Sequence, residues 1–230
     1  MASSNARGVA RPEVLVFDVN QTLSDMAPVA ALFEDVGAPA HQAQRWFAEL
    51  LRDGFALTAA GSSASFAEIG AEILRTTLDE PSLDRGLEEA VRHIMAGFGQ
   101  LPVHADVPDG VRDLTELGVR LVTMSNGATS VAAGLLERAG ILGRFERLLS
   151  AEESRAWKPA RSAYTYAVEQ CAVAPGEAML VAVHPWDIDG AARAGLRTAW
   201  LDRADSRYPA HFTAPEVRVT SLSELADHLR

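Results

Sequence analysis

Several apolar segments of the sequence are followed by polar side chains that could support nucleophilic catalysis. Asp18 comes directly after the run at 14–17 and could attack an electrophilic carbon. A carboxylate is a weak nucleophile in water, so the site must desolvate it while a nearby cation keeps it ionised. The candidate cation is Lys158, which is the only lysine among the 21 basic residues. An aspartate in such a loop could also be a simple helix cap.

Further polar residues follow the other apolar segments. Ser125 and Asn126 come after residues 120–124, and Asp187 comes shortly after residues 178–183. Each of them taken singly could cap a helix, and Asp187 could do so while also serving a site. Several such sets at the ends of apolar segments favour one shared site.

The apolar segments are predicted to be strands that alternate with helices. The expected strands are 14–17, 120–124, 147–150, 178–183 and 197–201, with an edge strand at 217–220. The expected helices between and after them are 107–117, 128–139, 162–171, 187–194 and the segment from 223. This alternation predicts an α/β fold with a doubly wound, Rossmann-like parallel sheet. In such a sheet the carboxyl ends of the strands meet at one rim, which would bring the polar sets together.

Residues 26–99 contain no strand candidate and are predicted to form an inserted, all-helical cap domain. Helical periodicity covers 27–36, 41–51, 65–77 and 83–98, and residues 54–65 are expected to be a loop. Ser65 and Glu68 have the spacing of a capping box. The expected domains are a flexible tail at 1–11, a core at 12–25 and 100–230, and the cap at 26–99.

Composition narrows the class of function. The net charge is −10 and no basic patch is evident, which argues against binding of nucleic acid. No apolar run is long enough to span a membrane, and residues 1–11 lack the apolar segment of a secretory signal. The single cysteine, Cys171, excludes an intramolecular disulfide. These features predict a cytoplasmic enzyme with a small-molecule substrate.

The polar sets also resemble the motifs of a known superfamily. Their sequences are Asp18-x-x-x-Thr22-Leu23, Ser125-Asn126-Gly127, Lys158-Pro159 and Trp186-Asp187-x-x-Gly190-Ala191. They are similar, in this order, to the four motifs of the haloacid dehalogenase superfamily, whose helical cap is inserted between the first two. Its phosphatases carry an acid/base aspartate where this chain has Asn20 and a Mg²⁺-binding aspartate where it has Val183. The pattern therefore resembles the (S)-2-haloacid dehalogenases, which implies neither metal nor cofactor.

The resemblance implies a role for each member of a catalytic set: Asp18, Thr22, Ser125, Lys158, Tyr164 and Asp187. Asp18 would displace halide and form an aspartyl ester, which a water positioned or activated by Asp187 would hydrolyse. Thr22 and Ser125 would hydrogen-bond the carboxylate of Asp18 or of the substrate. Tyr164 would orient Lys158 or Asp18, although a core aromatic would equally suit its helical position.

The sequence departs from this branch in the substrate pocket. Phe47 follows Trp46 where the branch has an arginine that holds the halide, and neither Arg45 nor Arg52 is a simple replacement. His184 stands where the branch has asparagine. The expected substrate-binding residues are Asn20, Gln21, Phe47, Asn126, His184 and Trp186.

The combined prediction is a metal-independent hydrolase that removes halide from short 2-haloalkanoic acids. One alternative is a hydrolase of the same superfamily acting on another small substrate, and Asn20 and Val183 argue against a Mg²⁺-dependent phosphatase. Another alternative is a non-catalytic binding protein. Relatives are often dimers, so the resemblance also implies a homodimer.

Overall fold

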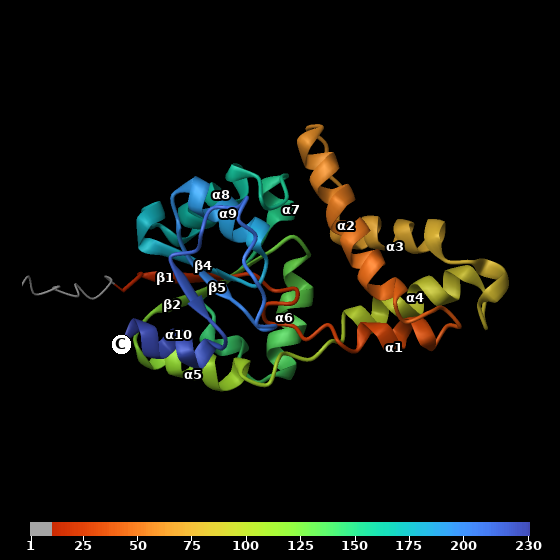
Figure 1. Ribbon diagram of the computed structural model, residues 1–230, viewed down its shortest axis with the longest axis horizontal. Coiled ribbons are helices and arrows are strands. Elements are labelled where there is room, and N and C mark those ends of the chain that lie inside the picture. Colours follow the sequence, from red (N-terminus) through yellow and green to blue (C-terminus); the bar gives the residue numbers. More distant parts are fainter. Residues whose placement is uncertain (1–10) are drawn as a thin grey trace, which may run out of the picture.

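The computed structural model describes residues 11–230, and it divides visibly into a layered core and a bundle of helices (Figure 1). The predicted tail at 1–11 lies outside the described residues except for Arg11. The Arg11 guanidinium donates hydrogen bonds to the backbone oxygens of Leu229 and Leu117, at 3.0 and 2.8 Å. Arg11 is therefore fastened to the core, contrary to its predicted place in the flexible tail.

The core is a six-stranded, wholly parallel sheet in the order β3-β2-β1-β4-β5-β6. Its strands are β1 (Val14–Phe17), β2 (Arg120–Ser125), β3 (Arg147–Ser150), β4 (Ala178–Ala182), β5 (Arg197–Leu201) and β6 (Val217–Val219). The predicted doubly wound α/β fold is confirmed, and β6 lies at one edge of the sheet, as predicted, with β3 at the other. The chain continues from β1 to β2 and β3 on one side, then crosses to β4, β5 and β6 on the other. The carboxyl end of β1 is thus the point where the strand order reverses.

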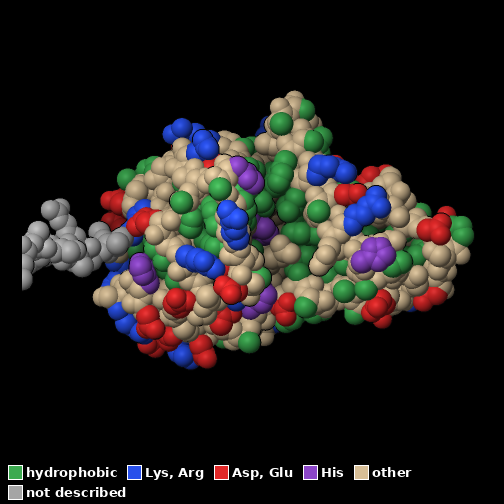
Figure 2. Space-filling model, viewed as in Figure 1, with side chains coloured by type: hydrophobic (Ala, Val, Ile, Leu, Met, Phe, Trp, Pro, Cys, Tyr) green, Lys and Arg blue, Asp and Glu red, His purple; other side chains and the backbone are tan. Residues whose placement is uncertain are grey.

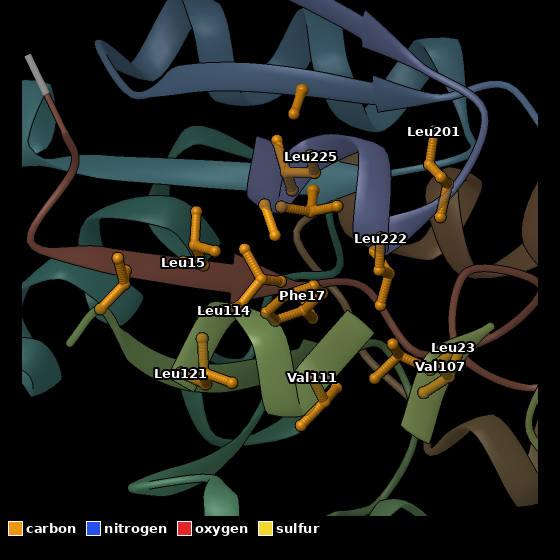
Figure 3. Packing of buried hydrophobic residues seen from close by; sticks show 14 of the residues in the cluster. Leu15, Phe17, Leu23, Val107, Val111, Leu114, Leu121, Leu201, Leu222 and Leu225 are labelled. Carbon is orange, nitrogen blue, oxygen red and sulfur yellow. The ribbon is translucent and has the colours of Figure 1, made fainter. Parts of the chain in front are cut away.

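Helices cover both faces of the sheet. Alternate residues of β1 point to opposite faces, and every one of its side chains is therefore buried. Leu15 and Phe17 pack with α5 (Val107–Glu116), α6 (Thr129–Arg138) and α10 (Leu222–Leu229) (Figure 3). Val14 and Val16 pack toward the opposite layer. This second layer contains α8 (Arg161–Cys171) and α9 (Pro185–Ala194). Shorter elements complete the core: α7 (Ala151–Ser154), η2 (Leu142–Arg144) and η3 (Pro175–Glu177).

The cap is a separate group of helices between β1 and α5, with its own hydrophobic cluster (Figure 1). Its elements are α1 (Val29–Glu34), α2 (Gln42–Ala59), α3 (Phe66–Thr77), η1 (Glu80–Ser82) and α4 (Leu87–Phe98). The predicted capping box is present at the start of α3, where Ser65 and Glu68 bond each other's backbone amides. The cap is therefore an independent packing unit, and its exact boundaries with the core stay a proposal.

The predicted loop at 54–65 is wrong over its first half, because α2 continues without a break to Ala59. Gly54, at which the predicted loop begins, lies inside the helix. A Cβ atom at this position would lie 2.3 Å from the ring of Trp157. The glycine is therefore explained by a tertiary contact, which no local pattern in the sequence reveals.

Trp157 fastens the core to the cap. Its ring is 1% exposed and belongs to the hydrophobic cluster of the cap, where it stacks on Phe66 with 5.8 Å between ring centroids. Its indole nitrogen donates to the backbone oxygen of Ala64, and its backbone nitrogen donates to Thr58 Oγ1. A core residue next to Lys158 is therefore built into the cap.

A hollow separates the two parts of the molecule elsewhere along their boundary (Figure 2). Hydrophobic and histidine side chains are visible along its walls, while charged side chains gather on the outer surfaces (Figure 2). Within residues 11–230, none of the helices combines the length and apolar character needed to cross a membrane.

Candidate active site

The site is centred on Asp18, directly after the central strand β1. Its backbone nitrogen continues the sheet by donating to the oxygen of Val181 in β4, at 3.0 Å. Open α/β sheets bind ligands at the carboxyl ends of their strands, where the strand order reverses. The side chain of Asp18 is only 6% exposed. The fold thus holds a nearly buried carboxylate at the usual ligand-binding point of such a sheet.

Three side chains donate hydrogen bonds to the carboxylate of Asp18. Lys158 Nζ lies 2.8 Å from Oδ1, while Thr22 Oγ1 and His184 Nδ1 lie 2.6 and 3.1 Å from Oδ2. Thr22 is held by the backbone nitrogen of Val183, which donates to its Oγ1 atom at 3.1 Å. The carboxylate is therefore oriented from both oxygens.

Lys158 lies between two carboxylates and is completely buried. Its Nζ atom is 2.8 Å from Asp18 Oδ1 and 2.6 Å from Asp187 Oδ2. Its backbone is clamped by the side-chain amide of Asn126, which accepts from the Lys158 nitrogen at 2.8 Å and donates to its oxygen at 3.2 Å. Asn126 therefore positions Lys158, and this contact differs from the predicted direct contact with substrate.

Tyr164 differs from its predicted role in orienting Lys158 or Asp18. Its hydroxyl donates to Oδ1 of Asp187 at 2.6 Å, and so it holds the second carboxylate. Gly190 makes this arrangement possible, because a Cβ atom there would lie 2.6 Å from the Tyr164 hydroxyl oxygen and 2.7 Å from Pro159 Cβ. The glycine of the last motif is therefore needed for close packing of α9 on α8 and the Lys158-Pro159 segment.

The charges of the three buried groups are interdependent. Burial would raise the pKa of Asp18, but the Lys158 charge and the hydrogen bond with His184 outweigh burial and hold this pKa well below its usual range. Burial would lower the pKa of Lys158, but the two carboxylates raise it. Burial raises the pKa of Asp187, and the attraction of Lys158 only partly opposes this effect. Of the two carboxylates, Asp18 therefore has the lower pKa and stays ionised to a lower pH.

His184 links Asp18 to side chains that lie where the core meets the cap. Its Nε2 atom lies 2.8 Å from Oε1 of Gln21, and its ring stacks on Trp186 with 4.9 Å between centroids. Phe47 of the cap faces the same ring at 6.5 Å. Trp186 also meets Phe55 of the cap, at 5.0 Å. The predicted substrate-binding residues Gln21, Phe47, His184 and Trp186 therefore lie together where the core meets the cap.

A cleft of about 870 Å³ opens beside this group, between the cap helices and the loop after β5. Gln21, His184 and Phe47 line it, together with apolar residues of α1 and α2. Arg45 and Arg52 lie outside the cleft lining, and they are 68% and 62% exposed and paired with carboxylates of the same helix. They do not replace the arginine that Phe47 displaces, as the sequence indicated.

Two predicted residues have surroundings that differ from expectation. Ser125 Oγ accepts a hydrogen bond from the backbone nitrogen of Gly127, and none of its hydrogen bonds within residues 11–230 reaches Asp18. Asn20 lines a separate small cavity of about 10 Å³ rather than the large cleft. Ser125 therefore shapes the loop after β2, and Asn20 is placed away from the cleft.

Sequence reasoning missed two residues that line the cleft. Arg203 donates to the backbone oxygen of Thr22 at 2.9 Å and to Asp106 at 2.7 Å, so it fixes the loop that carries Asp18. His104 Nε2 lies 2.9 Å from the backbone oxygen of Gln21. The signal for Arg203 was present, since it follows a predicted strand just as the other site residues do.

Comparisons with known proteins identify the family of the chain. Residues 12–195 match the family model of haloacid dehalogenase-like hydrolases. A curated relative, haloacetate dehalogenase H-2 of Moraxella sp. (strain B), is 28% identical over 83% of this chain and 86% of its own. An (S)-2-haloacid dehalogenase of Pseudomonas sp. (strain YL) is 24% identical, over 93% and 92%. A solved structure of an L-2-haloacid dehalogenase superposes with a TM-score of 0.88 at 25% identity, over 96% of this chain and 99% of that one. The chain therefore belongs to the family of haloacid dehalogenase-like hydrolases.

Proposed function

We propose that this protein hydrolyses the carbon–halogen bond of short 2-haloalkanoic acids through an ester on Asp18. The observation that carries the proposal is the contact between the buried Asp18 carboxylate and the buried Lys158 ammonium, at 2.8 Å. This pairing keeps the carboxylate ionised while excluding water, which is the state in which it is a useful nucleophile. The names of the relatives support a halogenated acid as the substrate.

The contacts of Asp18 suit a displacement in two steps. In the first step a carboxylate oxygen attacks the carbon that bears the halogen, an ester bond forms and halide leaves with the bonding electrons. In the second step water attacks the ester carbonyl, the 2-hydroxy acid is released, and Asp18 becomes a carboxylate again with the loss of one proton to solvent. Phe47 and the apolar residues of α1 and α2 give the cleft a wall suited to a small alkyl halide.

The proposed reaction needs no metal ion, and the residues present fit a divalent cation poorly. Such a cation would need oxygen ligands from Asp18 and Asp187, but the ammonium of Lys158 occupies the space between these carboxylates. Val183, at the position where phosphatases carry a further aspartate, supplies no side-chain oxygen. A magnesium-dependent phosphatase is therefore the weaker alternative. A cytoplasmic location and a homodimer remain predictions.

Halide release tests the proposal. Purified protein would be incubated with chloroacetate, bromoacetate and 2-chloropropionate in the presence of a metal chelator, and free halide would be measured. We expect release by the wild type, none by Asp18→Asn, and full release by Asp109→Asn, which changes an exposed aspartate of α5. Equal activity of Asp18→Asn and wild type would contradict the proposal. Release of phosphate from p-nitrophenyl phosphate only when Mg²⁺ is added would favour the phosphatase.

A further inference from the structure

The two oxygens of the Asp18 carboxylate have different hydrogen-bond partners. Oδ2 accepts from both Thr22 Oγ1 and His184 Nδ1. Within residues 11–230, Oδ1 accepts one hydrogen bond, from Lys158. A carboxylate oxygen has two lone pairs, so Oδ1 retains one for attack whereas both lone pairs of Oδ2 are engaged. An ester formed in the proposed reaction would therefore be attached at Oδ1, and Oδ2 would become its carbonyl oxygen.

Both donors at Oδ2 are fixed before any substrate binds. The oxygen of Thr22 accepts a hydrogen bond from the Val183 nitrogen, so its own hydrogen is directed to Asp18. The ring of His184 is held by Gln21 through Nε2 and by stacking on Trp186. An ionised carboxylate can only accept hydrogen bonds, so the hydrogen between it and the imidazole belongs to Nδ1, just as the hydrogen between the ring and the Gln21 amide oxygen belongs to Nε2. His184 is thus a preorganised donor to Oδ2.

We propose that His184 is a catalytic residue that, together with Thr22, forms the oxyanion site for hydrolysis of the Asp18 ester. This inference rests on the proposed function. When water attacks the ester carbonyl carbon, negative charge develops on Oδ2, which lies 2.6 Å from Thr22 Oγ1 and 3.1 Å from His184 Nδ1. These are the distances at which donors stabilise an oxyanion.

The step balances in atoms and charge. Water gives a proton to the Asp187 carboxylate and its oxygen bonds to the Asp18 carbonyl carbon, which places the negative charge on Oδ2. When the charge returns to carbon, the bond from that carbon to Oδ1 breaks. The departing alkoxide of the 2-hydroxy acid takes the proton back from Asp187. The second hydrogen of the water, left on the Asp18 carboxyl group, is released to solvent as a proton, and Asp18 is again a carboxylate. His184 donates a hydrogen bond throughout and neither gains nor loses a proton.

The same hydrogen bond affects the two halves of the reaction in opposite directions. In the first half Oδ2 loses charge as the ester forms, so a donor at Oδ2 gives no acceleration. In the second half Oδ2 gains a full charge, so the donor stabilises the transition state more than the ester. Removal of the donor is therefore expected to slow hydrolysis selectively, and the ester should accumulate.

The test uses the variants His184→Ala and His184→Asn. The side-chain nitrogen of asparagine can occupy the place of Nδ1, so His184→Asn retains a donor that His184→Ala lacks. Each protein would be mixed with bromoacetate, quenched at intervals, and examined by intact-protein and peptide mass spectrometry while bromide is measured. We expect His184→Ala to release one equivalent of bromide rapidly and to accumulate the ester on Asp18, with hydrolysis slowed about 10²- to 10³-fold. His184→Asn should hydrolyse the ester about ten times faster than His184→Ala.

The outcomes separate the inference from the function on which it rests. Turnover by His184→Ala at the wild-type rate without ester would overturn the role of His184 but leave the dehalogenase proposal standing. Accumulation of ester in both variants to the same extent would also overturn the donor role. Asparagine keeps a hydrogen-bond donor at this position, so it should restore part of the hydrolysis if donation is what His184 contributes. Absence of both bromide release and adduct in the wild type would overturn the proposed function itself. Circular dichroism of each variant would establish that it is folded.

Gln21 offers a second variant that leaves the imidazole in place. Its backbone has a φ of 64°, a conformation that glycine adopts without strain, so Gln21→Gly removes the amide that holds His184 without a backbone penalty. We expect a smaller accumulation of the ester, per equivalent of bromide released, than in His184→Ala. Hydrolysis at the full wild-type rate in Gln21→Gly would show that Gln21 is not a positioning residue for His184.

Discussion

The ring of Trp157 occupies the space into which Gly54 would project a Cβ atom, and the separation would be only 2.3 Å. Gly54 belongs to α2 of the cap, whereas Trp157 belongs to the core segment that continues into Lys158. Their close approach joins the cap to the part of the core that holds the buried cation. The position of the cap is thus coupled to the position of Lys158.

Gly54→Ala tests this coupling. Alanine should stabilise a helix interior by about 1 kcal/mol relative to glycine. The clash with Trp157 should reverse that effect and lower the free energy of unfolding by about 1–3 kcal/mol. Urea unfolding would measure it, and Gly143→Ala is the matched control because no atom lies within 4 Å of its added Cβ. Equal or greater stability of Gly54→Ala would show that the cap does not rest on this contact.

Replacement of the buried cation should destabilise the whole site. Lys158→Met leaves two buried carboxylates without a counter-ion and is expected to cost about 3–5 kcal/mol of unfolding free energy. Adding Asp187→Asn removes one of these carboxylates, so the double variant should be more stable than the additive sum predicts. Chemical denaturation of the two single variants and the double variant measures this coupling. Strict additivity would contradict a direct interaction between Lys158 and Asp187.

The Asp18 carboxylate should stay ionised in acid. Its pKa in the folded protein lies below 3.8, the ordinary value for aspartate, because Lys158 and His184 stabilise the charged form. Asp18 therefore contributes stability above pH 3.8 and loses that contribution as the pH falls through its lower, folded pKa. An infrared difference spectrum between wild type and Asp18→Asn should still show the carboxylate band at pH 3.8. A band reduced to half at that pH would mean that the pKa is not lowered.

Much of the fold and the position of the site follow from the sequence. Short apolar runs predicted all six strands, since residues buried on both faces of a parallel sheet leave a continuous apolar signal. The polar residues after them converge because parallel strands end at one rim. Asp18 and Asp187 were found in this way, whereas Lys158 was found as the only lysine of the chain and the capping box at Ser65 by its spacing.

What the sequence could not reveal depends on tertiary contacts. The glycine inside α2 at position 54 is explained by the ring of Trp157, more than a hundred residues away. The use of the Asn126 amide to hold the Lys158 backbone has no local signature, because either role suits an asparagine in a loop. The partner of Tyr164 was likewise undetermined, since helical periodicity fixes the face of a side chain but not the polar atom it reaches.

Tyr164→Phe measures how much the hydrogen bond from Tyr164 to Asp187 contributes to the free energy of unfolding. The variant leaves Asp187 Oδ1 without its hydroxyl donor in a fully buried setting, and we expect a loss of about 1–3 kcal/mol. Tyr208→Phe is a suitable control because the Tyr208 hydroxyl bonds a backbone oxygen at the partly exposed edge of the core. Thermal or urea unfolding of both variants compares them. A smaller loss for Tyr164→Phe than for Tyr208→Phe would argue against a strong bond to Asp187.

The most direct test of the account is a single turnover in water labelled with ¹⁸O, with protein in excess over bromoacetate. If Asp18 forms the ester and water attacks its carbonyl carbon, the label should enter the Asp18 carboxylate and be absent from the glycolate formed in this turnover. Peptide mass spectrometry would locate the label on the segment that contains Asp18. Label in the glycolate, with unlabelled Asp18, would show that water attacks the substrate directly and would contradict Asp18 as the nucleophile.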